Sequence, residues 1–456
     1  MADPIGERLL LPGRVHFIGI GGIGMAGLAR LLLQAGFKVS GSDHQSNRLT
    51  ESLAKEGVRI YHGHHPNHVR DLPDWAIRTP ALGEGNPEVD FLRANQIPVM
   101  VRGQVLAAYS KQRCCIAVAG AHGKTTTSAM LASLLYTAGN GAGYAVGGET
   151  QLPGRVADVG DGKTLVLEAD ESDGTLVYYR PEVGILTHVE WDHVERFRSE
   201  EALLQCYRKF VQQCGEVWIR EGDMLAEKVC RDISNLRRVG ESEKADLRLM
   251  SIEQDADGQR VCFQLEDYKH SFWIPIPGKH NAWNGLMALA GALYLGVPVS
   301  DACDALSLFK GVARRFQKIE KNGRLFIQDY AHHPTEIRAV MASAKALDAK
   351  RIWLVFQPHR FSRTRHLLDD FVRSFAGADR LALLPVYAAS ELSSQGVGSE
   401  LLAEQCREKY GKVDVFADRA ALIQKWTPDL RKGDVVLIVG AGDIEALQNE
   451  WVAALP

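Results

Sequence analysis

The sequence predicts an α/β protein of three domains, in which each domain is a mainly parallel sheet with flanking helices. Two strand–glycine–helix units, beginning near residues 14 and 115, and a last block of alternating strands and helices predict this class. The length of 456 residues fits three domains at roughly 150 residues each. We expect the domains to span residues 1–107, 108–312 and 313–456.

Composition and charge exclude several classes of protein. Hydrophobic residues make up 46% and charged residues 24% of the chain, as in ordinary globular proteins rather than disordered or fibrous ones. The formal charge of −3 gives no basic footprint for nucleic acid. No apolar run is long enough to insert into a membrane, and the first residues lack the pattern of a signal peptide. The eight cysteines form no C-x-x-C pair, which argues against zinc and disulfide frameworks. We therefore expect a cytoplasmic protein.

The first block opens with a βαβ unit, with strands over 14–18 and 37–40 and a helix over 25–35. A G-x-G-x-x-G motif lies between the first strand and the helix, so its backbone amides can approach a diphosphate, while Asp43 follows the second strand and can accept bonds from a ribose or a base. A nicotinamide cofactor and a UDP-sugar both carry a diphosphate. The block is Rossmann-like and ends in turn-rich sequence and a polar linker over 109–113. The predicted diphosphate loop comprises Gly19, Gly21, Gly22, Ile23 and Gly24.

The second block begins with a strand over 115–119 that runs into a phosphate loop, two residues shorter than the usual G-x-x-x-x-G-K-[ST]. Its amides and Lys124 suit the β- and γ-phosphates of ATP, and the Thr125 hydroxyl suits Mg²⁺. The domain is therefore expected to resemble a P-loop ATPase. The predicted ATP-binding loop comprises Gly120, Ala121, His122, Gly123, Lys124, Thr125 and Thr126.

Acidic and amide side chains follow the next elements of this block. Glu168 comes directly after a buried strand over 164–167, and His193 follows another over 183–187, so both are candidate Mg²⁺ ligands. Asn281 and Asn284 lie three apart on one helical face, which suits either the recognition of adenine or polar capping.

The third block alternates strands and helices, with strands over 325–328, 352–356, 381–384, 413–416 and 435–439, and is also Rossmann-like. Polar motifs over 329–336 and 357–365 each follow a strand, where open α/β sheets bind ligands. The planar guanidinium groups of Arg360 and Arg363 match carboxylate or phosphate oxygens, although a basic run can also be a solvated surface.

Taken together, eight motifs resemble the Mur ligase family of peptidoglycan synthesis. They occur in the family's order between residues 19 and 365: GIGGIGM, GAHGKTTT, EADESDGT, DHVERF, GKHNAWN, ARRFQ, DYAHHPTE and QPHRFSRTR. The resemblance implies a ligase that uses ATP and Mg²⁺ to join L-alanine to the lactyl carboxylate of UDP-N-acetylmuramate through an acyl phosphate. It also implies that the third domain closes over the ATP and the amino acid, in a monomer or weak homodimer.

The resemblance assigns a role to each candidate residue. The first glycine loop and Asp43 would face the UDP group, with Glu171 beside the sugar. Lys124 and Thr125 would hold phosphates and Mg²⁺, with Glu168 and His193 as further metal ligands. The adenine would contact Asn281 and Asn284, and the remaining contacts to phosphate, ribose, muramyl carboxylate and alanine would come from Arg315, Asp329, Tyr330, His332, Arg360 and Arg363. We expect Lys124, Arg315 and His332 to be catalytic, with His332 as the base that deprotonates alanine, because His193 is committed to the metal.

Three other functions stay open at this point. The tripeptide-recycling ligase of the same family shares most of these motifs. A dinucleotide-dependent oxidoreductase would use the first glycine loop alone, and a nucleotide-binding regulator would not need the third block's arginines. The sequence also departs from the family pattern at Ala121, His188, Trp191 and Gln328, none of which replaces a proposed ligand.

Overall fold

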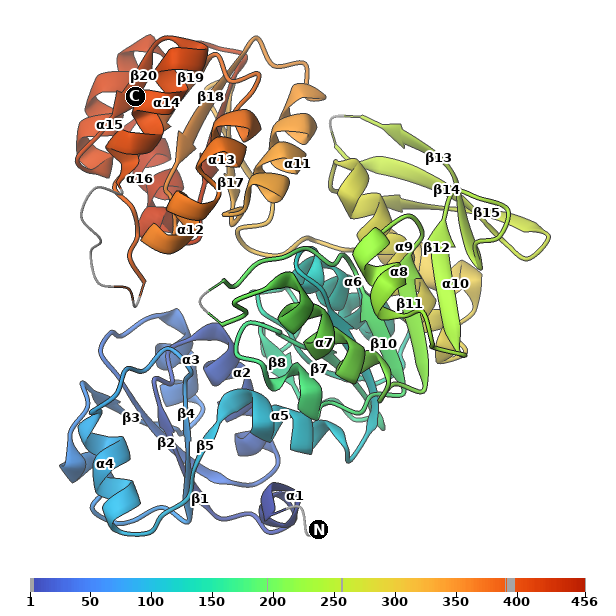
Figure 1. Cartoon of the computed structure of the whole chain (residues 1–456), viewed down its shortest axis with the longest axis vertical. Helices are drawn as coiled ribbons and strands as arrows, with labels where there is room; N and C mark the ends of the chain where they lie inside the picture. Colours follow the sequence, from blue (N-terminus) through green and yellow to red (C-terminus); the bar gives the residue numbers. More distant parts are fainter. Residues whose placement is uncertain (1–3, 195, 256, 390, 392–397, 456) are drawn as a thin grey trace. The chain divides into compact units, whose positions relative to one another are not determined.

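The computed structural model describes residues 4–194, 196–255, 257–389, 391 and 398–455. It contains three sheets with flanking helices (Figure 1), which confirms the predicted fold class. The chain divides into two compact units. The first unit comprises Met1–Ser251, Cys262–Phe272 and Trp283–Lys310, and the second comprises Ile252–Val261, Trp273–Ala282 and Gly311–Pro456.

The first sheet has five parallel strands in the order β3-β2-β1-β4-β5. This order reverses direction beside β1, and such a switch point is where open α/β sheets bind ligands. The strands are β1 (Arg14–Ile18), β2 (Lys38–Asp43), β3 (Arg59–His62), β4 (Trp75–Arg78) and β5 (Val99–Val101). The helices are α1 (Pro4–Leu9), α2 (Ile23–Gln34), α3 (Arg48–Lys55), η1 (Pro66–Val69), α4 (Pro87–Ala94) and α5 (Arg102–Ser110).

The sequence interpretation was incomplete at the end of this block. The segment expected to be turn-rich forms β3 to β5 with intervening helices. The predicted linker over 109–113 is wrong in its first part, because Tyr109 and Ser110 end α5 and are buried. Small and apolar residues before them gave α5 a face that packs into the core.

The second sheet has ten strands in the order β15-β14-β13-β12-β11-β10-β6-β9-β7-β8. Strand β6 lies between β10 and β9 and is parallel to both, and its residues 115–119 are buried, as its continuous apolar run predicts. The strands are β6 (Cys114–Ala119), β7 (Gly143–Ala145), β8 (Ala157–Asp158), β9 (Thr164–Glu168), β10 (Val183–Leu186), β11 (Glu216–Arg220), β12 (Leu236–Gly240), β13 (Leu247–Gln254), β14 (Gln259–Leu265) and β15 (Tyr268–Ile274). The helices are α6 (Lys124–Thr137), η2 (Thr175–Tyr178), α7 (Glu200–Val211), α8 (Met224–Val229), α9 (Lys279–Tyr294) and α10 (Val299–Ser307).

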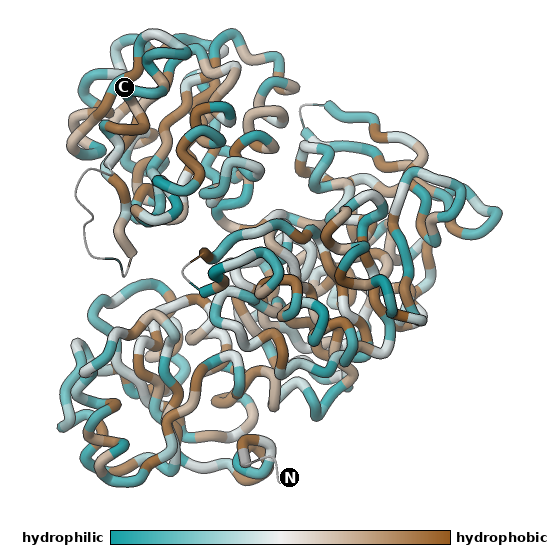
Figure 2. The backbone as a smooth tube through the Cα atoms, viewed as in Figure 1, coloured by the Kyte–Doolittle hydropathy of each residue, from teal (hydrophilic) through white to brown (hydrophobic). Residues whose placement is uncertain are grey.

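The third sheet has six strands in the order β16-β17-β21-β18-β19-β20, and only β16 is antiparallel to its neighbour. Its strands are hydrophobic (Figure 2), and alternate residues such as Trp353 and Leu354 enter separate cores on the two faces. The strands are β16 (Gln317–Lys321), β17 (Arg324–Asp329), β18 (Arg351–Phe356), β19 (Arg380–Leu383), β20 (Val413–Val415) and β21 (Asp434–Val439). The helices are α11 (Pro334–Lys345), α12 (Phe361–His366), α13 (Leu368–Ser374), α14 (Ser399–Tyr410), α15 (Arg419–Trp426), η3 (Thr427–Asp429), η4 (Asp443–Ala446) and α16 (Leu447–Ala454).

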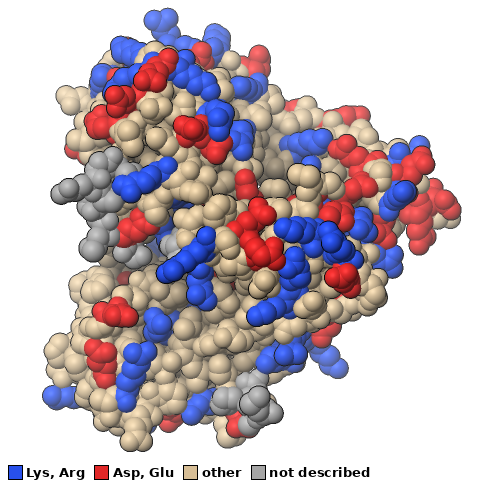
Figure 3. Space-filling model, in the orientation of Figure 1, with Lys and Arg blue, Asp and Glu red and all other residues tan. Residues whose placement is uncertain are grey.

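The distribution of charge agrees with the composition. On the side of the molecule in Figure 3, basic and acidic side chains are interspersed rather than gathered into one basic face. No helix among the described residues is both long and apolar enough to cross a membrane.

Candidate active site

The first glycine loop lies between β1 and α2, where the sequence predicts it. Gly19 has a φ of +82°, a conformation that favours glycine, and its amide donates to Ser42 O at 2.9 Å. Asp43 ends β2 and accepts from the Gly21 amide at 2.8 Å, while Asn47 Nδ2 donates to Gly21 O at 3.0 Å. The loop is therefore held from below, and its role in binding UDP stays a prediction.

The phosphate loop joins β6 to α6. Gly120 and Gly123 have φ values of +129° and +81°, and a Cβ on Gly120 would lie 2.7 Å from His188 O, so only glycine fits there. Gly123 precedes the first helical residue, Lys124, which directs the amides at the start of α6 toward the loop. The loop thus has the geometry of an anion site at a helix N-terminus.

Lys124 is held by the loop and by a buried carboxylate. Its Nζ donates to Gly120 O at 2.6 Å and to the two oxygens of Glu171 at 2.9 and 3.0 Å. Burial disfavours the charged form of Lys124, but the carboxylates of Glu171, Asp170 and Glu168 outweigh it and raise the pKa of Lys124. The ammonium group therefore stays charged at the point where the loop would hold phosphates.

Thr125 and Glu168 meet beside this loop. Thr125 Oγ1 donates to Glu168 Oε1 at 3.0 Å, and the Gly147 amide donates to Glu168 Oε2 at 2.7 Å. Burial raises the pKa of Glu168, although Lys124 and the Gly147 bond oppose the rise. A hydroxyl and a carboxylate in contact are hard oxygen donors, so both residues fit Mg²⁺.

A second group of candidate metal ligands comprises Asp170, Glu171 and His193, whose donor atoms lie within 4.8 Å of one another. His193 Nε2 lies 3.3 Å from Glu171 Oε1, and its φ of +57° is unusual for a side chain with a Cβ. Burial opposes the ionisation of Asp170, but the charges of Lys124, His193 and Arg102 lower its pKa to about 2. Sequence reasoning did not select Asp170, although it belongs to the same acidic run as Glu168.

The departures from the family pattern lie around the loop. His188 Nδ1 lies 2.8 Å from Asp223 Oδ2, its carbonyl accepts from the Ala121 amide at 2.7 Å, and its ring stacks against that of His122. Trp191 Nε1 donates to Phe197 O at 3.3 Å. Glu195, in the same motif, lies outside the described residues. These contacts hold the segment between β10 and α7 without using Glu168 or Lys124.

Both asparagines lie in the first turns of α9, and both are buried. Asn281 Nδ2 donates to Pro277 O at 2.7 Å. A Cβ on Gly123 would lie 2.6 Å from Asn284 Oδ1, so Asn284 packs directly under the phosphate loop. Asn281 thus closes the turn before its helix, whereas Asn284 is placed beside the loop. Their contact with adenine stays a prediction.

In the second unit, β17 ends at Asp329. Its carboxylate accepts from the Ala331 and Phe316 amides at 2.8 Å each, which ties the segment before β16 to the end of β17. Burial raises the pKa of Asp329 to about 6, against the charge of Arg315 and these two bonds. The Arg315 guanidinium lies over the Tyr330 ring, 5.1 Å from its centroid. Gln328, another departure, donates to Glu445 O at 2.8 Å.

The remaining predicted residues gather around His359. The His332 and His359 rings are in an edge-to-face contact, and Arg363 Nη1 lies 3.3 Å from His359 Nδ1. His332 Nδ1 lies 3.1 Å from Tyr330 O, which can only accept, so Nδ1 carries the proton and Nε2 carries the lone pair. Arg360 has a φ of +70°, as backbones at functional sites often do. Sequence reasoning did not select His359.

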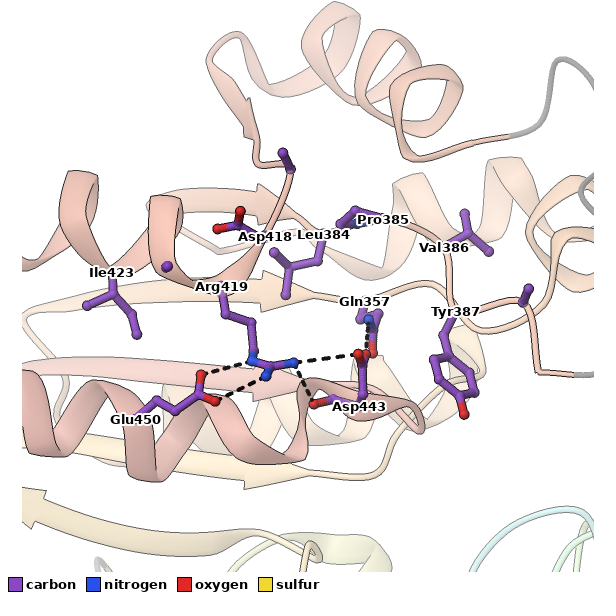
Figure 4. A pocket seen from close by; sticks show the side chains of 13 residues that line it. Gln357, Leu384, Pro385, Val386, Tyr387, Asp418, Arg419, Ile423, Asp443 and Glu450 are labelled. Carbon is purple, nitrogen blue, oxygen red and sulfur yellow. Dashed lines mark hydrogen bonds and ion pairs between the residues drawn. The ribbon is translucent and has the colours of Figure 1, made fainter. Parts of the chain in front are cut away.

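A separate pocket of about 630 Å³ lies at the carboxyl ends of β18, β19, β20 and β21 (Figure 4). Arg419 extends along it and forms two bonds to Glu450, with Nε–Oε2 at 2.8 Å. Gln357 Nε2 donates to Asp443 Oδ1 at 2.7 Å. None of the described residues that line the pocket is a predicted site residue, and we assign it no step.

Comparisons with known proteins agree with this arrangement. Three family models match the chain: "Mur ligase family, catalytic domain" over 14–113, "Mur ligase middle domain" over 118–292, and "Mur ligase, glutamate ligase domain" over 314–442. A UDP-N-acetylmuramate–L-alanine ligase of Anaeromyxobacter sp. (strain Fw109-5) is 37% identical over 451 residues, covering 97% of this chain and 98% of the relative.

Two solved structures are also similar over nearly the full length. The UDP-N-acetylmuramate–alanine ligase of Thermotoga maritima is 27% identical with a TM-score of 0.83, covering 97% of this chain and 98% of that one. A murein peptide ligase of Psychrobacter arcticus is 25% identical with a TM-score of 0.73 at the same coverage. With these models and relatives, the chain belongs to the Mur ligase family.

Proposed function

We propose that this chain is an ATP-dependent ligase that joins L-alanine to the lactyl carboxylate of UDP-N-acetylmuramate and releases ADP and phosphate. The observation that carries the proposal is the phosphate loop with Lys124 and Thr125, on a chain that is 37% identical over almost its full length to an enzyme named for this reaction. The same loop favours a ligase over the dinucleotide-dependent oxidoreductase, which would leave it without a role.

Each predicted domain has its own part in the proposal. Residues 1–107 bind the UDP-sugar, residues 108–312 bind ATP, and residues 313–456 bind the amino acid and close over both substrates. The substrates are cytoplasmic metabolites in such a reaction, so we place the enzyme in the cytoplasm, as a monomer or weak homodimer. Closure of a domain would exclude water from a reactive intermediate.

The first step activates the carboxylate. An oxygen of the lactyl carboxylate attacks the γ-phosphorus of ATP, the bond to the β-phosphate oxygen breaks, and ADP leaves with that electron pair. Lys124 lies where it neutralises charge on the phosphates, and the loop amides orient them. Glu171 fixes the direction of Lys124 through both of its oxygens. Arg315 is the proposed second cation on the phosphates.

The second step forms the amide. The amine of L-alanine attacks the carbonyl carbon of the acyl phosphate, and the tetrahedral intermediate expels phosphate as the C–O bond breaks. The amine must first lose its ammonium proton, and His332 Nε2, which carries the lone pair, is the proposed base. Arg360 and Arg363 are the proposed partners of the two substrate carboxylates, which suit their guanidinium groups.

Thr125, Glu168 and His193 are the residues that would hold Mg²⁺. Asp170 and Glu171 add further oxygen donors nearby. When bound, Mg²⁺ supplies positive charge beside the β- and γ-phosphate oxygens. The residues themselves keep the hydroxyl of Thr125 directed at the carboxylate of Glu168.

One assay separates this function from its family rival. The chain is incubated with ATP, Mg²⁺ and UDP-N-acetylmuramate, and phosphate release and amide product are measured with L-alanine or with a muropeptide tripeptide as the amine. We expect kcat/KM to be higher for alanine. A higher kcat/KM for the tripeptide would assign the chain to the recycling reaction, for which the similarity to the Psychrobacter arcticus enzyme is a reason to test.

A further inference from the structure

The sugar-nucleotide site as described so far has no cation. A nucleoside diphosphate brings about two negative charges, while a helix N-terminus offers only about half a positive charge. The atoms nearest to the four glycines of the loop come from Thr79, Asp43, Asn47 and Met25 at three of them, and Asp43 adds a negative charge. A diphosphate here needs a positive group from elsewhere in the chain.

Arg102 supplies that group at the fourth glycine. A Cβ on Gly24 would lie 2.9 Å from Arg102 Nη1 and 3.1 Å from Cζ, so the guanidinium packs against the first turn of α2. This turn has no acidic residue, and no side chain caps it. Its amides and the guanidinium therefore present donors to the same place, although Gly24 and Arg102 are far apart in the sequence.

The structure fixes Arg102 in this position from its other side. Arg102 is the first residue of α5, and a Cβ on the next residue, Gly103, would collide with Thr175 Oγ1. The start of α5 therefore packs closely against η2, which directly follows the acidic loop. Thr175 is itself held by Asp173, whose Oδ1 accepts from the Thr175 amide at 2.9 Å.

The charges around Arg102 keep it ionised without engaging it. Burial disfavours its charge, but the Tyr179 hydroxyl and the carboxylates of Asp170 and Asp173 outweigh burial and raise the pKa of Arg102. Among the described residues, its guanidinium forms no direct hydrogen bond or ion pair. A guanidinium has five N–H donors, and those of Arg102 remain available to a ligand.

We propose that Arg102 binds the diphosphate of the sugar nucleotide at the N-terminus of α2 and thereby orients the sugar toward the acidic loop at 168–173. The inference rests on the proposed function, because it takes the first glycine loop to be the UDP site. It adds a binding residue from outside that loop. It also explains why Gly24 and Gly103 both lack side chains, since a Cβ at either position would displace Arg102.

The test compares nucleotide affinities of the full chain by titration calorimetry, with UDP and UMP as probes. Removing a charge-assisted contact lowers affinity by about 10- to 100-fold. We expect Arg102→Gln to lose that much affinity for UDP and much less for UMP, which lacks the second phosphate. Arg102→Lys should recover part of the loss. Arg93→Gln, an exposed change in the same block, should match the parent.

Catalysis provides a second readout. Arg102→Gln should raise KM for UDP-N-acetylmuramate by a similar factor and leave KM for ATP and for alanine within about twofold. Gly24→Ala should also weaken UDP binding, and it should add little in the Arg102→Gln background, because both changes act on the same contact. This pair of variants keeps the test valid if one single variant folds poorly.

The outcomes separate the two proposals. Parent-like UDP affinity in Arg102→Gln, or equal losses for UDP, UMP and ATP, would overturn the inference alone. A parent chain that binds UDP through Arg102 but makes no alanyl product would overturn the proposed function alone. A parent chain that binds no UDP would overturn both.

Discussion

The contact between Lys124 and Glu171 makes two predictions that can be separated in one experiment. Glu171 is only 1% exposed, and both of its oxygens accept from Lys124 Nζ. Lys124→Met removes the cation that the proposed mechanism places on the phosphates. It also leaves a buried carboxylate without its cation. We therefore expect both turnover and stability to fall.

The magnitudes follow from the geometry. Removing one partner of a buried ion pair costs about 3–5 kcal/mol, because the other charge stays desolvated. Removing one preorganised donor from the transition state costs about 10²- to 10³-fold in kcat. The double variant Lys124→Met/Glu171→Gln removes both charges and should regain most of the stability, while turnover stays low.

The assay measures urea unfolding at pH 7 and phosphate release at saturating substrates, for the parent, both variants and Lys163→Met. Lys163 is exposed just before β9 and controls for the loss of a lysine. Parent-level turnover in Lys124→Met would refute the role of the phosphate loop. A double variant as unstable as the single one would instead refute the argument about the unpaired carboxylate.

Three further predictions concern other parts of the chain. Burial opposes the ionisation of Glu88, but bonds from His16, Ser42 and His68 lower its pKa from 4.5 to about 2, so it contributes about 3 kcal/mol above pH 4.5 that is lost as the pH falls toward 2; acid unfolding of Glu88→Gln should lack this loss, and an unchanged profile would contradict it. Gly103→Ala should destabilise by about 1–3 kcal/mol in urea, through its collision with η2, and an equally stable variant would argue against that packing. His332→Ala should lower turnover at saturating alanine by about 10²-fold or more, with a residual rate that rises with pH as free amine accumulates; unchanged turnover would remove His332 as the base.

Local patterns carried much of the prediction from sequence. The two glycine loops could be predicted because a strand, a glycine turn and a helix are consecutive in the chain, and Gly120 tolerates no side chain beside His188 O. The antiparallel strand β16 was not predicted, since its residues are mostly polar. The signal was present in Asn322-Gly323, which joins β16 to β17 with φ values of +54° and +70°.

Contacts between distant segments could not be predicted in the same way. The Arg102 guanidinium is placed by Gly24 and by the packing of Gly103 on Thr175, and no spacing rule links these positions. The pairing of Glu171 with Lys124 is of the same kind, because it depends on how β6 and β9 lie side by side in the sheet. Motifs identified the chemistry of the site, but only the fold shows which charges face one another.

The balance of those charges leads to a last prediction about metal removal. Glu168, Asp170 and Glu171 surround the single ammonium of Lys124, so the loop alone is too acidic to attract a triphosphate. ATP must then bring added cations, and we expect chelation of divalent metal to weaken ATP binding by more than tenfold in calorimetry. Glu168→Gln removes one of these charges and should make ATP binding less dependent on metal, because less repulsion remains to be offset. The matched change Glu149→Gln, at a partly exposed glutamate paired with Arg155, should keep the parent's dependence. Equal ATP affinity with and without metal in the parent would mean that these carboxylates do not face the triphosphate.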